Sequence, residues 1–146
     1  MKEKPNSLFE QILDAAEARP KNMGSLRDAN AHAKVTGPCG DTVEMWLRID
    51  GGRIRKAMFM TDGCEPSIAC SSAAAKLVEG MKPEQAQKLT QTEVLEAAGA
   101  IPPDHHHCAS LAAGTIESAI IDWIEQPAKK PFIEKLKTKL NRRFNR

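Results

Sequence analysis

The chain has 146 residues, of which 41% are hydrophobic and 27% are charged. These values are typical of one compact globular domain and exclude a disordered or fibrous chain. The net charge of +2 is unevenly spread, because residues 127–146 hold eight basic residues and one acid and so leave −5 for the rest. This distribution argues against a dedicated nucleic-acid-binding domain, whose positive charge would extend over the whole fold.

Membrane insertion and secretion are not expected either. No apolar run reaches the roughly 20 residues that span a bilayer, and residues 1–11 lack the apolar stretch of a signal peptide. A cytoplasmic location is therefore expected. In that compartment the four cysteines favour metal binding or thiol chemistry over disulfide bonds.

The sequence up to residue 61 predicts a helix followed by a small antiparallel sheet. Residues 8–18 have the apolar spacing of a short amphipathic helix. In residues 41–50 apolar side chains occupy every second position, which is the period of a half-buried strand. An Asp-Gly-Gly turn follows, so residues 53–61 are expected to return antiparallel, with a bulge near Ile54 where the alternation breaks. Residues 31–35 predict a weaker third strand.

The remainder is predicted to be mainly helical. Proline, glycine and apolar spacing place helices over residues 66–79, 83–89, 93–98 and 108–125. An extended break is expected at Ile101-Pro-Pro103. Strands followed by helices indicate an α+β fold, with the helices packed on one face of a three-stranded antiparallel sheet. Residues 1–126 are expected to form this domain, and residues 127–146 a basic C-terminal helical extension.

Three cysteines lie at joints between the predicted elements. Cys39 lies just before the hairpin, Cys64 between the return strand and the next helix, and Cys108 at the start of the long helix. Loops at one end of a sheet converge, so these thiols can meet, and Asp41 and His107 can add an oxygen or a nitrogen donor. Helix N-termini favour thiolates, the form that binds metal, at Cys64 and Cys108. Soft sulfur with one harder ligand fits an iron–sulfur cluster or zinc.

These motifs, in this order and spacing, resemble the IscU/NifU-type family of scaffolds for iron–sulfur cluster assembly. The resemblance covers nearly the whole body of the chain and implies the family's SufE/NifU-like α+β fold. It rests on Gly37-Pro-Cys39-Gly-Asp41, on Thr61-Asp-Gly-Cys64, and on Ile101-Pro-Pro followed by His107-Cys108.

The resemblance also implies a role for each of five residues. Cys39, Cys64 and Cys108 match the cysteines that hold the nascent [2Fe–2S] cluster, and Cys108 is expected to accept sulfur from a cysteine desulfurase. Asp41 matches a ligand that keeps the cluster labile. His107 matches an alternative ligand, so the choice of Asp41 or His107 as fourth ligand stays open. The protein would then bind iron and act as a scaffold, not an enzyme, and pass its cluster to apo iron–sulfur acceptor proteins.

Other partners and residues are less closely defined by the resemblance. A ferredoxin or another iron donor and a second copy of the chain remain open as partners. Recognition by an Hsp70-type chaperone is not implied, because the family's Leu-Pro-Pro-Val-Lys segment reads Ile-Pro-Pro-Asp104-His105 here. His105 and His106 are expected to face solvent from a loop. Cys70 is expected to fill the core.

Two other functions would use the same region. The first is a SufU-like sulfur acceptor that stimulates a cysteine desulfurase, with zinc held by the three cysteines and Asp41. The interval between Cys64 and Cys108 has no room for the insertion of that zinc-dependent branch. The second is metal-assisted hydrolysis by the histidine run, which lacks a glutamate base beside a metal motif such as HExxH. Iron content and cluster transfer separate the scaffold from the zinc-bound acceptor.

Overall fold

A computed structural model describes residues 19–126 of the chain. The elements are β1 (Ala31–Thr36), β2 (Thr42–Asp50), β3 (Arg53–Thr61), α2 (Glu65–Val78), α3 (Pro83–Ala86), α4 (Gln91–Ala98), the 3₁₀ turn η1 (Pro103–His105) and α5 (His107–Glu125). The helices predicted at 8–18 and 127–146 lie outside the described residues, so the domain boundary at residue 126 stays a prediction. Every helix between residues 19 and 126 is too short or too polar to cross a membrane.

The three strands form one antiparallel sheet in the order β1-β2-β3, as the sequence predicts. The predicted bulge is also present, close to the hairpin turn. Arg48 pairs with Lys56 while the next residue, Ile49, pairs with Ile54, so Arg55 is an extra residue on β3. The bulge keeps the apolar residues on both sides of it facing the core.

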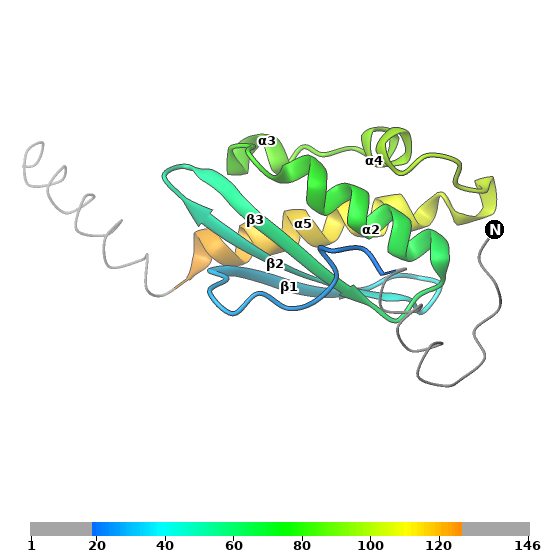
Figure 1. Cartoon of the computed structure of the whole chain (residues 1–146), viewed down its shortest axis with the longest axis horizontal. Helices are drawn as coiled ribbons and strands as arrows, with labels where there is room; N and C mark the ends of the chain where they lie inside the picture. The colour runs from blue at the N-terminus through cyan, green and yellow to red at the C-terminus, as the bar shows by residue number, and fades with distance from the viewer. Residues whose placement is uncertain (1–18, 127–146) are drawn as a thin grey trace, which may run out of the picture.

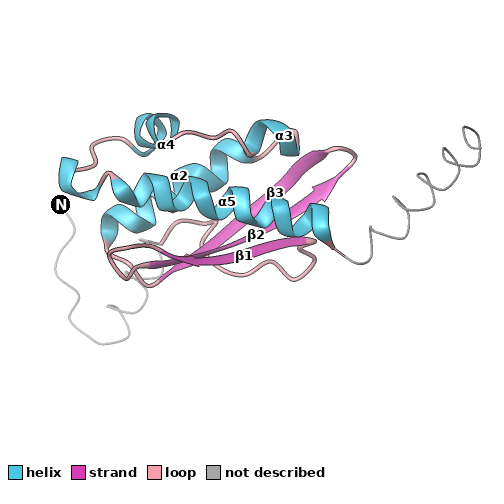
Figure 2. Cartoon of the chain, turned by 180° about the vertical axis from the view of Figure 1, so that it is seen from behind, coloured by secondary structure: helices cyan, strands magenta, loops and turns pink. Residues whose placement is uncertain are grey.

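The helices cover one face of this sheet, which confirms the predicted α+β architecture (Figures 1 and 2). Helix α5 lies along β1 and β2, α2 lies along β3 and against α5, and α4 packs on both helices. The alternating apolar residues of β2 point into this layer, and Met45 and Leu47 are fully buried there together with Phe59 of β3. Trp46 points to the opposite face, where its ring lies 5.4 Å from that of His32.

The helix boundaries follow their capping residues more closely than the apolar pattern. Helix α4 begins at Gln91, two residues earlier than predicted, because Thr90 and Glu93 form a reciprocal capping box ahead of it. Pro66 lies in the first turn of α2, as expected. The break predicted at Ile101-Pro-Pro103 is only partly extended, because Pro103 begins the turn η1.

The chain that leads into the sheet lies along the outer edge of β3. The Phe59 N–H donates to the Asn22 carbonyl (3.0 Å), and the Gly24 N–H donates to the Phe59 carbonyl (2.7 Å). The Asn22 side chain also donates to the carbonyl of Ser72 on α2 (3.0 Å). These bonds satisfy polar groups that β3 would otherwise expose at the sheet edge.

Candidate metal centre

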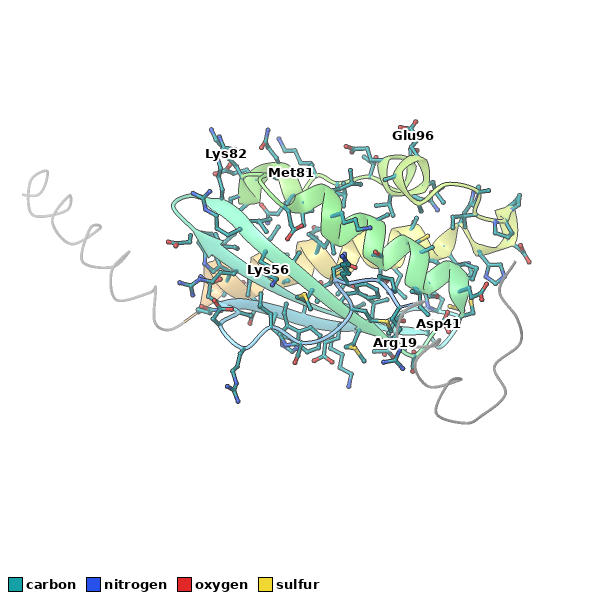
Figure 3. All side chains as sticks on the ribbon, in the orientation of Figure 1. Arg19, Asp41, Lys56, Met81, Lys82 and Glu96 are labelled. Atoms are coloured by element: carbon teal, nitrogen blue, oxygen red, sulfur yellow. The ribbon has the colours of Figure 1, made fainter. Side chains whose placement is uncertain are left out.

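The three joints predicted to converge do so at one end of the sheet. Cys39 and Asp41 lie in the loop between β1 and β2, Cys64 lies between β3 and α2, and His107 and Cys108 form the first turn of α5. In Figure 3, Asp41 lies at the end of the sheet where α2 begins, away from Met81 and Lys82 at the opposite end. The candidate centre is therefore built by segments far apart in the sequence.

The loop between β1 and β2 is a tight turn with Cys39 at its exposed tip. The Gly37 N–H donates to the Asp41 carbonyl (2.8 Å), and the Gly40 N–H donates to the Gly37 carbonyl (3.0 Å). Gly40 has φ +90°, a conformation that favours glycine. A Cβ at Gly37 would lie 3.2 Å from a methyl group of Leu111, so the loop packs closely against α5.

The turn between β3 and α2 is tied to the start of β2. The Thr42 N–H donates to Asp62 Oδ1 (2.8 Å), and the Thr61 hydroxyl donates to the Thr42 carbonyl (2.7 Å). The Gly63 N–H in turn donates to Thr61 Oγ1 (3.1 Å). These bonds hold Cys64, the exposed N-cap residue of α2, next to the loop that carries Asp41.

Ser67 joins two of the predicted ligands and was not singled out from the sequence. Its hydroxyl donates to Asp41 Oδ2 (3.0 Å) and lies 3.3 Å from Cys108 Sγ. A Cβ at Gly63 would lie 2.5 Å from Ser67 Oγ and 3.0 Å from Asp41 Oδ2, so glycine leaves the room that this contact needs. Ser67 is buried, and its one proton can serve either the carboxylate or the sulfur at a time.

Two overlapping groups of side chains have the spacing of metal ligands. Donor atoms of Cys39, Asp41 and His107 all lie within 4.8 Å of one another, and so do those of His105, His107 and Cys108. His107 belongs to both groups. The structure thus brings four of the five predicted residues into these groups, and Cys64 lies beside them, with its Sγ 3.9 Å from His105 Nδ1.

His105 differs from its expected place in a solvent-facing loop. Its side chain is 35% exposed, and its ring is turned toward Cys64 and His107, with 6.0 Å between the two imidazole centroids. The turn η1 produces this orientation. Pro102 precedes this turn and Pro103 begins it. This proline pair was the available signal in the sequence, because proline favours tight turns.

Burial changes the expected reactivity of the thiol at the start of α5. Cys108 is 1% exposed, and burial raises its pKa, as do the negative charges of Cys64 and Asp41; donation from the Ser67 hydroxyl acts in the opposite direction. The prediction that its helix N-terminus favours the thiolate is therefore wrong for Cys108 in the metal-free protein. Cys70 fills the core as expected, fully buried, and burial raises its pKa to about 11.

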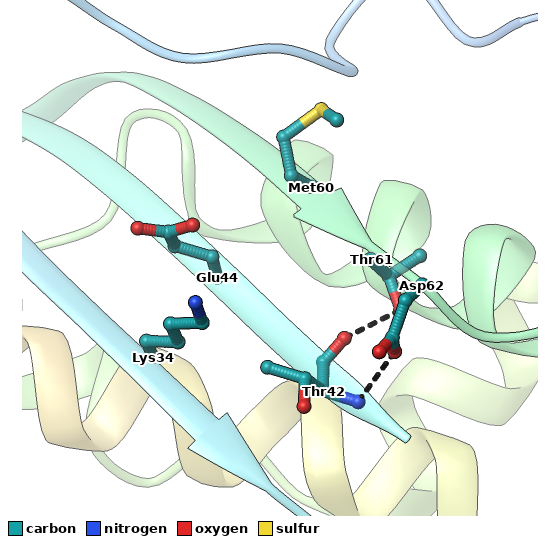
Figure 4. A pocket seen from close by; sticks show the side chains of 6 residues that line it. All are labelled: Lys34, Thr42, Glu44, Met60, Thr61 and Asp62. Atoms are coloured by element: carbon teal, nitrogen blue, oxygen red, sulfur yellow. Dashed lines mark hydrogen bonds between the residues drawn. The ribbon is translucent and has the colours of Figure 1, made fainter.

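A shallow hollow of about 290 Å³ lies on the sheet face away from the helices (Figure 4). Its walls come from the three strands and include the oppositely charged Lys34 and Glu44, together with Met60. Thr42, Thr61 and Asp62, whose hydrogen bonds hold the β3–α2 turn, also line it. It contains none of the cysteines, so this hollow is distinct from the candidate centre at the end of the sheet.

Comparison with known proteins decides the family. Residues 9–130 match the sequence model of the family described as NifU-like N terminal domain. The chain belongs to this family. The resemblance drawn from the three cysteine motifs is thereby confirmed.

Curated relatives of this NifU-like chain extend over most of its length. The iron–sulfur cluster assembly scaffold protein IscU 1 of Archaeoglobus fulgidus is 36% identical over 119 residues, which cover 81% of this chain and 76% of the relative. IscU of Escherichia coli K12 is 34% identical, with 78% and 91% covered. A Drosophila melanogaster relative, 32% identical with 86% and 84% covered, is named an iron–sulfur cluster assembly enzyme.

Solved structures share the fold of this NifU-like chain. The N-terminal part of a NifU-like protein from Brucella abortus superposes with a TM-score of 0.58 at 21% identity, covering 80% of this chain and 93% of that one. A Fervidobacterium islandicum protein assigned to iron–sulfur cluster assembly by the SUF system gives 0.56 at 20% identity, with 78% and 95% covered. At these identities the likeness supports the fold alone.

Proposed function

We propose that this NifU-like chain is a scaffold on which an iron–sulfur cluster is assembled and from which it is released. The observation that carries the proposal is the meeting of Cys39, Asp41, His107 and Cys108 at one end of the sheet, with Cys64 beside them. Three thiols with a carboxylate and an imidazole suit iron and sulfide. The scaffold names of the relatives support the same function.

Sulfur reaches the scaffold as a persulfide on a cysteine desulfurase. The thiolate of Cys108 attacks the outer sulfur, a new S–S bond forms on Cys108, and the desulfurase cysteine leaves as a thiolate. Because Cys108 is buried in the metal-free chain, the loop that carries Cys39 or the turn before α5 must first open. Docking of the desulfurase supplies that opening.

A [2Fe–2S] cluster then forms with balanced electrons. Two persulfide sulfurs need four electrons to become two sulfides, and two Fe²⁺ supply two of them as they become Fe³⁺. A ferredoxin-type donor supplies the other two. The three cysteines hold the cluster, and Asp41 or His107 fills the fourth position until an apo acceptor protein takes the cluster.

Asp41 makes the cluster labile, because one carboxylate among thiolates is a weaker and harder ligand for iron. Asp41→Ala is therefore expected to retain its cluster several times longer than the wild type when an apo acceptor is added. The measurement is the decay of the visible charge-transfer absorption under anaerobic conditions. Asp28→Ala removes an exposed carboxylate beyond the other end of the sheet and serves as the control. Loss at the wild-type rate in Asp41→Ala would remove the lability role.

Zinc-bound sulfur acceptance is the second candidate, since the same cysteines, aspartate and histidines also suit zinc. Anaerobic purification followed by analysis of iron, acid-labile sulfide and zinc separates the two, provided that iron, cysteine and a desulfurase are then supplied. The scaffold proposal expects equal iron and sulfide and transfer to an apo acceptor. Zinc that persists through this treatment would support the acceptor instead. Zinc in the first sample alone decides nothing, because Zn²⁺ outcompetes Fe²⁺ for such ligands.

A further inference from the structure

The hydroxyl of Ser67 connects three segments of the chain at the candidate centre. Ser67 lies in the first turn of α2 and is 1% exposed. Its Oγ is 3.0 Å from Asp41 Oδ2 in the β1–β2 loop and 3.3 Å from Cys108 Sγ at the start of α5. Within residues 19–126, no other hydrogen-bond donor reaches the Asp41 carboxylate. One buried hydroxyl therefore contacts two of the candidate ligands.

The direction of each hydrogen bond follows from the number of protons available. A serine hydroxyl has one proton to donate and two lone pairs with which it accepts. The Asp41 carboxylate can only accept, so the Ser67 proton points to Oδ2. The contact with Cys108 is then made by the thiol, which donates its proton to Ser67 Oγ. In the metal-free chain, Ser67 thus holds both side chains at once.

Binding of a cluster removes one of these two hydrogen bonds. A cysteine sulfur bound to iron carries no proton, so it can accept a hydrogen bond but cannot donate one. The single proton of Ser67 then serves either the Asp41 carboxylate or the Cys108 sulfur. Ser67 is therefore better satisfied in the metal-free chain, and for a buried hydroxyl this difference favours departure of the cluster.

We propose that Ser67 is a positioning residue that promotes release of the cluster, an inference that rests on the proposed function. As the bonds to iron break, the Cys108 sulfur takes up a proton from solvent and donates it to Ser67 Oγ, and the Ser67 hydroxyl donates to Asp41. Gly63 leaves room for this arrangement, because a Cβ there would lie 2.5 Å from Ser67 Oγ. Hydrogen-bond partners of metal ligands commonly change metal affinity by about 10–100-fold.

Ser67→Ala tests the proposal on clusters assembled anaerobically on the full chain from iron, cysteine and a desulfurase. After an apo acceptor is added, the variant is expected to retain its visible absorption about threefold longer than the wild type, or more. Ser71→Ala is the matched control. It removes a buried hydroxyl from the same helix that has no hydrogen-bond partner among residues 19–126, and should decay at the wild-type rate. Equal decay in the two serine variants would overturn the proposal.

Two further measurements distinguish this role from general damage to the packing. In the metal-free protein, Ser67→Ala should unfold at a lower urea concentration than the wild type, because it loses both hydrogen bonds. In the loaded protein it should have a more negative reduction potential, since a hydrogen bond to a ligand stabilises the reduced cluster. Damaged packing alone would shorten retention of the cluster. A shorter retention or an unchanged potential would therefore contradict the proposal.

A double variant shows whether Ser67 acts through Asp41. In an Asp41→Ala chain only Cys108 remains to be held, so Ser67→Ala should lengthen retention less than it does in the wild type. Equal lengthening in the two backgrounds would exclude the contact with Asp41 as the cause. If the wild type assembles no cluster, the proposed function fails and this inference with it. If the wild type assembles and releases clusters but Ser67→Ala behaves as Ser71→Ala does, only this inference fails.

Discussion

The four cysteines divide into an exposed pair and a buried pair. Cys39 and Cys64 lie in connections at the end of the sheet and are open to solvent, whereas Cys70 and Cys108 lie on helices within the core. Cys108 nevertheless shares a ligand group with His105 and His107. The candidate centre therefore has two halves. The open half is formed by the loops that carry the exposed Cys39 and Cys64, and the closed half is formed by the packed helices that bury Cys108. The open half can thus admit ions and partner proteins, and the closed half can hold a bound ion in place.

Thiol alkylation should show this division most strongly. In the metal-free protein, Cys39 and Cys64 are expected to react with iodoacetamide at least about a hundredfold faster than Cys108, which reacts only when its surroundings open locally. Cys70 should be slowest, because it is fully buried and its pKa is raised to about 11. The measurement is peptide mass spectrometry over a time course.

The pH dependence of the same reaction gives a further check. Only the thiolate reacts, and the raised pKa of Cys108 lowers its thiolate fraction below that of a thiol with the ordinary value of 9.0. Its rate should therefore keep rising above pH 9. Reaction of Cys108 as fast as that of Cys39 near neutral pH would mean that the start of α5 opens readily. The division into exposed and buried cysteines would then not hold in solution.

Replacing Gly63 should disturb the close contact of Gly63, Ser67 and Asp41, which joins the open and closed halves of the candidate centre. In Gly63→Ala the new methyl would lie 2.5 Å from Ser67 Oγ and 2.6 Å from its Cβ, so Ser67 or the turn must move away from Asp41. We expect a loss of about 1–3 kcal/mol in the free energy of unfolding, as for other overpacked sites. The measurement is urea unfolding of the metal-free protein.

Gly114→Ala is the matched control for that substitution. Gly114 lies within α5, and a Cβ added there would meet no atom of the described residues within 4 Å, apart from its own helix backbone and chain neighbours. Alanine should stabilise the helix there by about 0.5–1 kcal/mol. If Gly63→Ala were as stable as Gly114→Ala, the close packing of Gly63, Ser67 and Asp41 would not exist in solution.

The sheet and the meeting of the candidate ligands were predictable because each depends on local rules. Period-two alternation placed β2, and its interruption near Ile54 located the bulge. Cys39, Cys64 and Cys108 lie at joints, and joints at one sheet end converge. The side-chain directions were not predictable in this way. The ring of His105 is set by a 3₁₀ turn, and the burial of Cys108 depends on which side of α5 faces the core.

The smallest expected effect is the pH dependence of stability that arises from the buried thiol of Cys70. A thiol whose pKa is about 11 when folded and near 9.0 when unfolded keeps its proton in the native state at pH 9–11. Its contribution is complete below about pH 9 and is lost as the pH rises from there to about 11. Linkage gives a loss of about 1 kcal/mol at pH 10. The stability difference between wild type and Cys70→Ala should therefore shrink by that amount from pH 8 to pH 10.

Ser71→Ala is the control for this titration, because Ser71 is a buried neighbour whose hydroxyl does not ionise in this range. Among residues 19–126 its Oγ finds no hydrogen-bond partner, so its removal should cost little and the difference from wild type should not vary with pH. A pH-independent difference for Cys70→Ala as well would mean that water or an opening of α2 reaches this thiol. The core around Cys70 would then be less protected from solvent than its burial indicates.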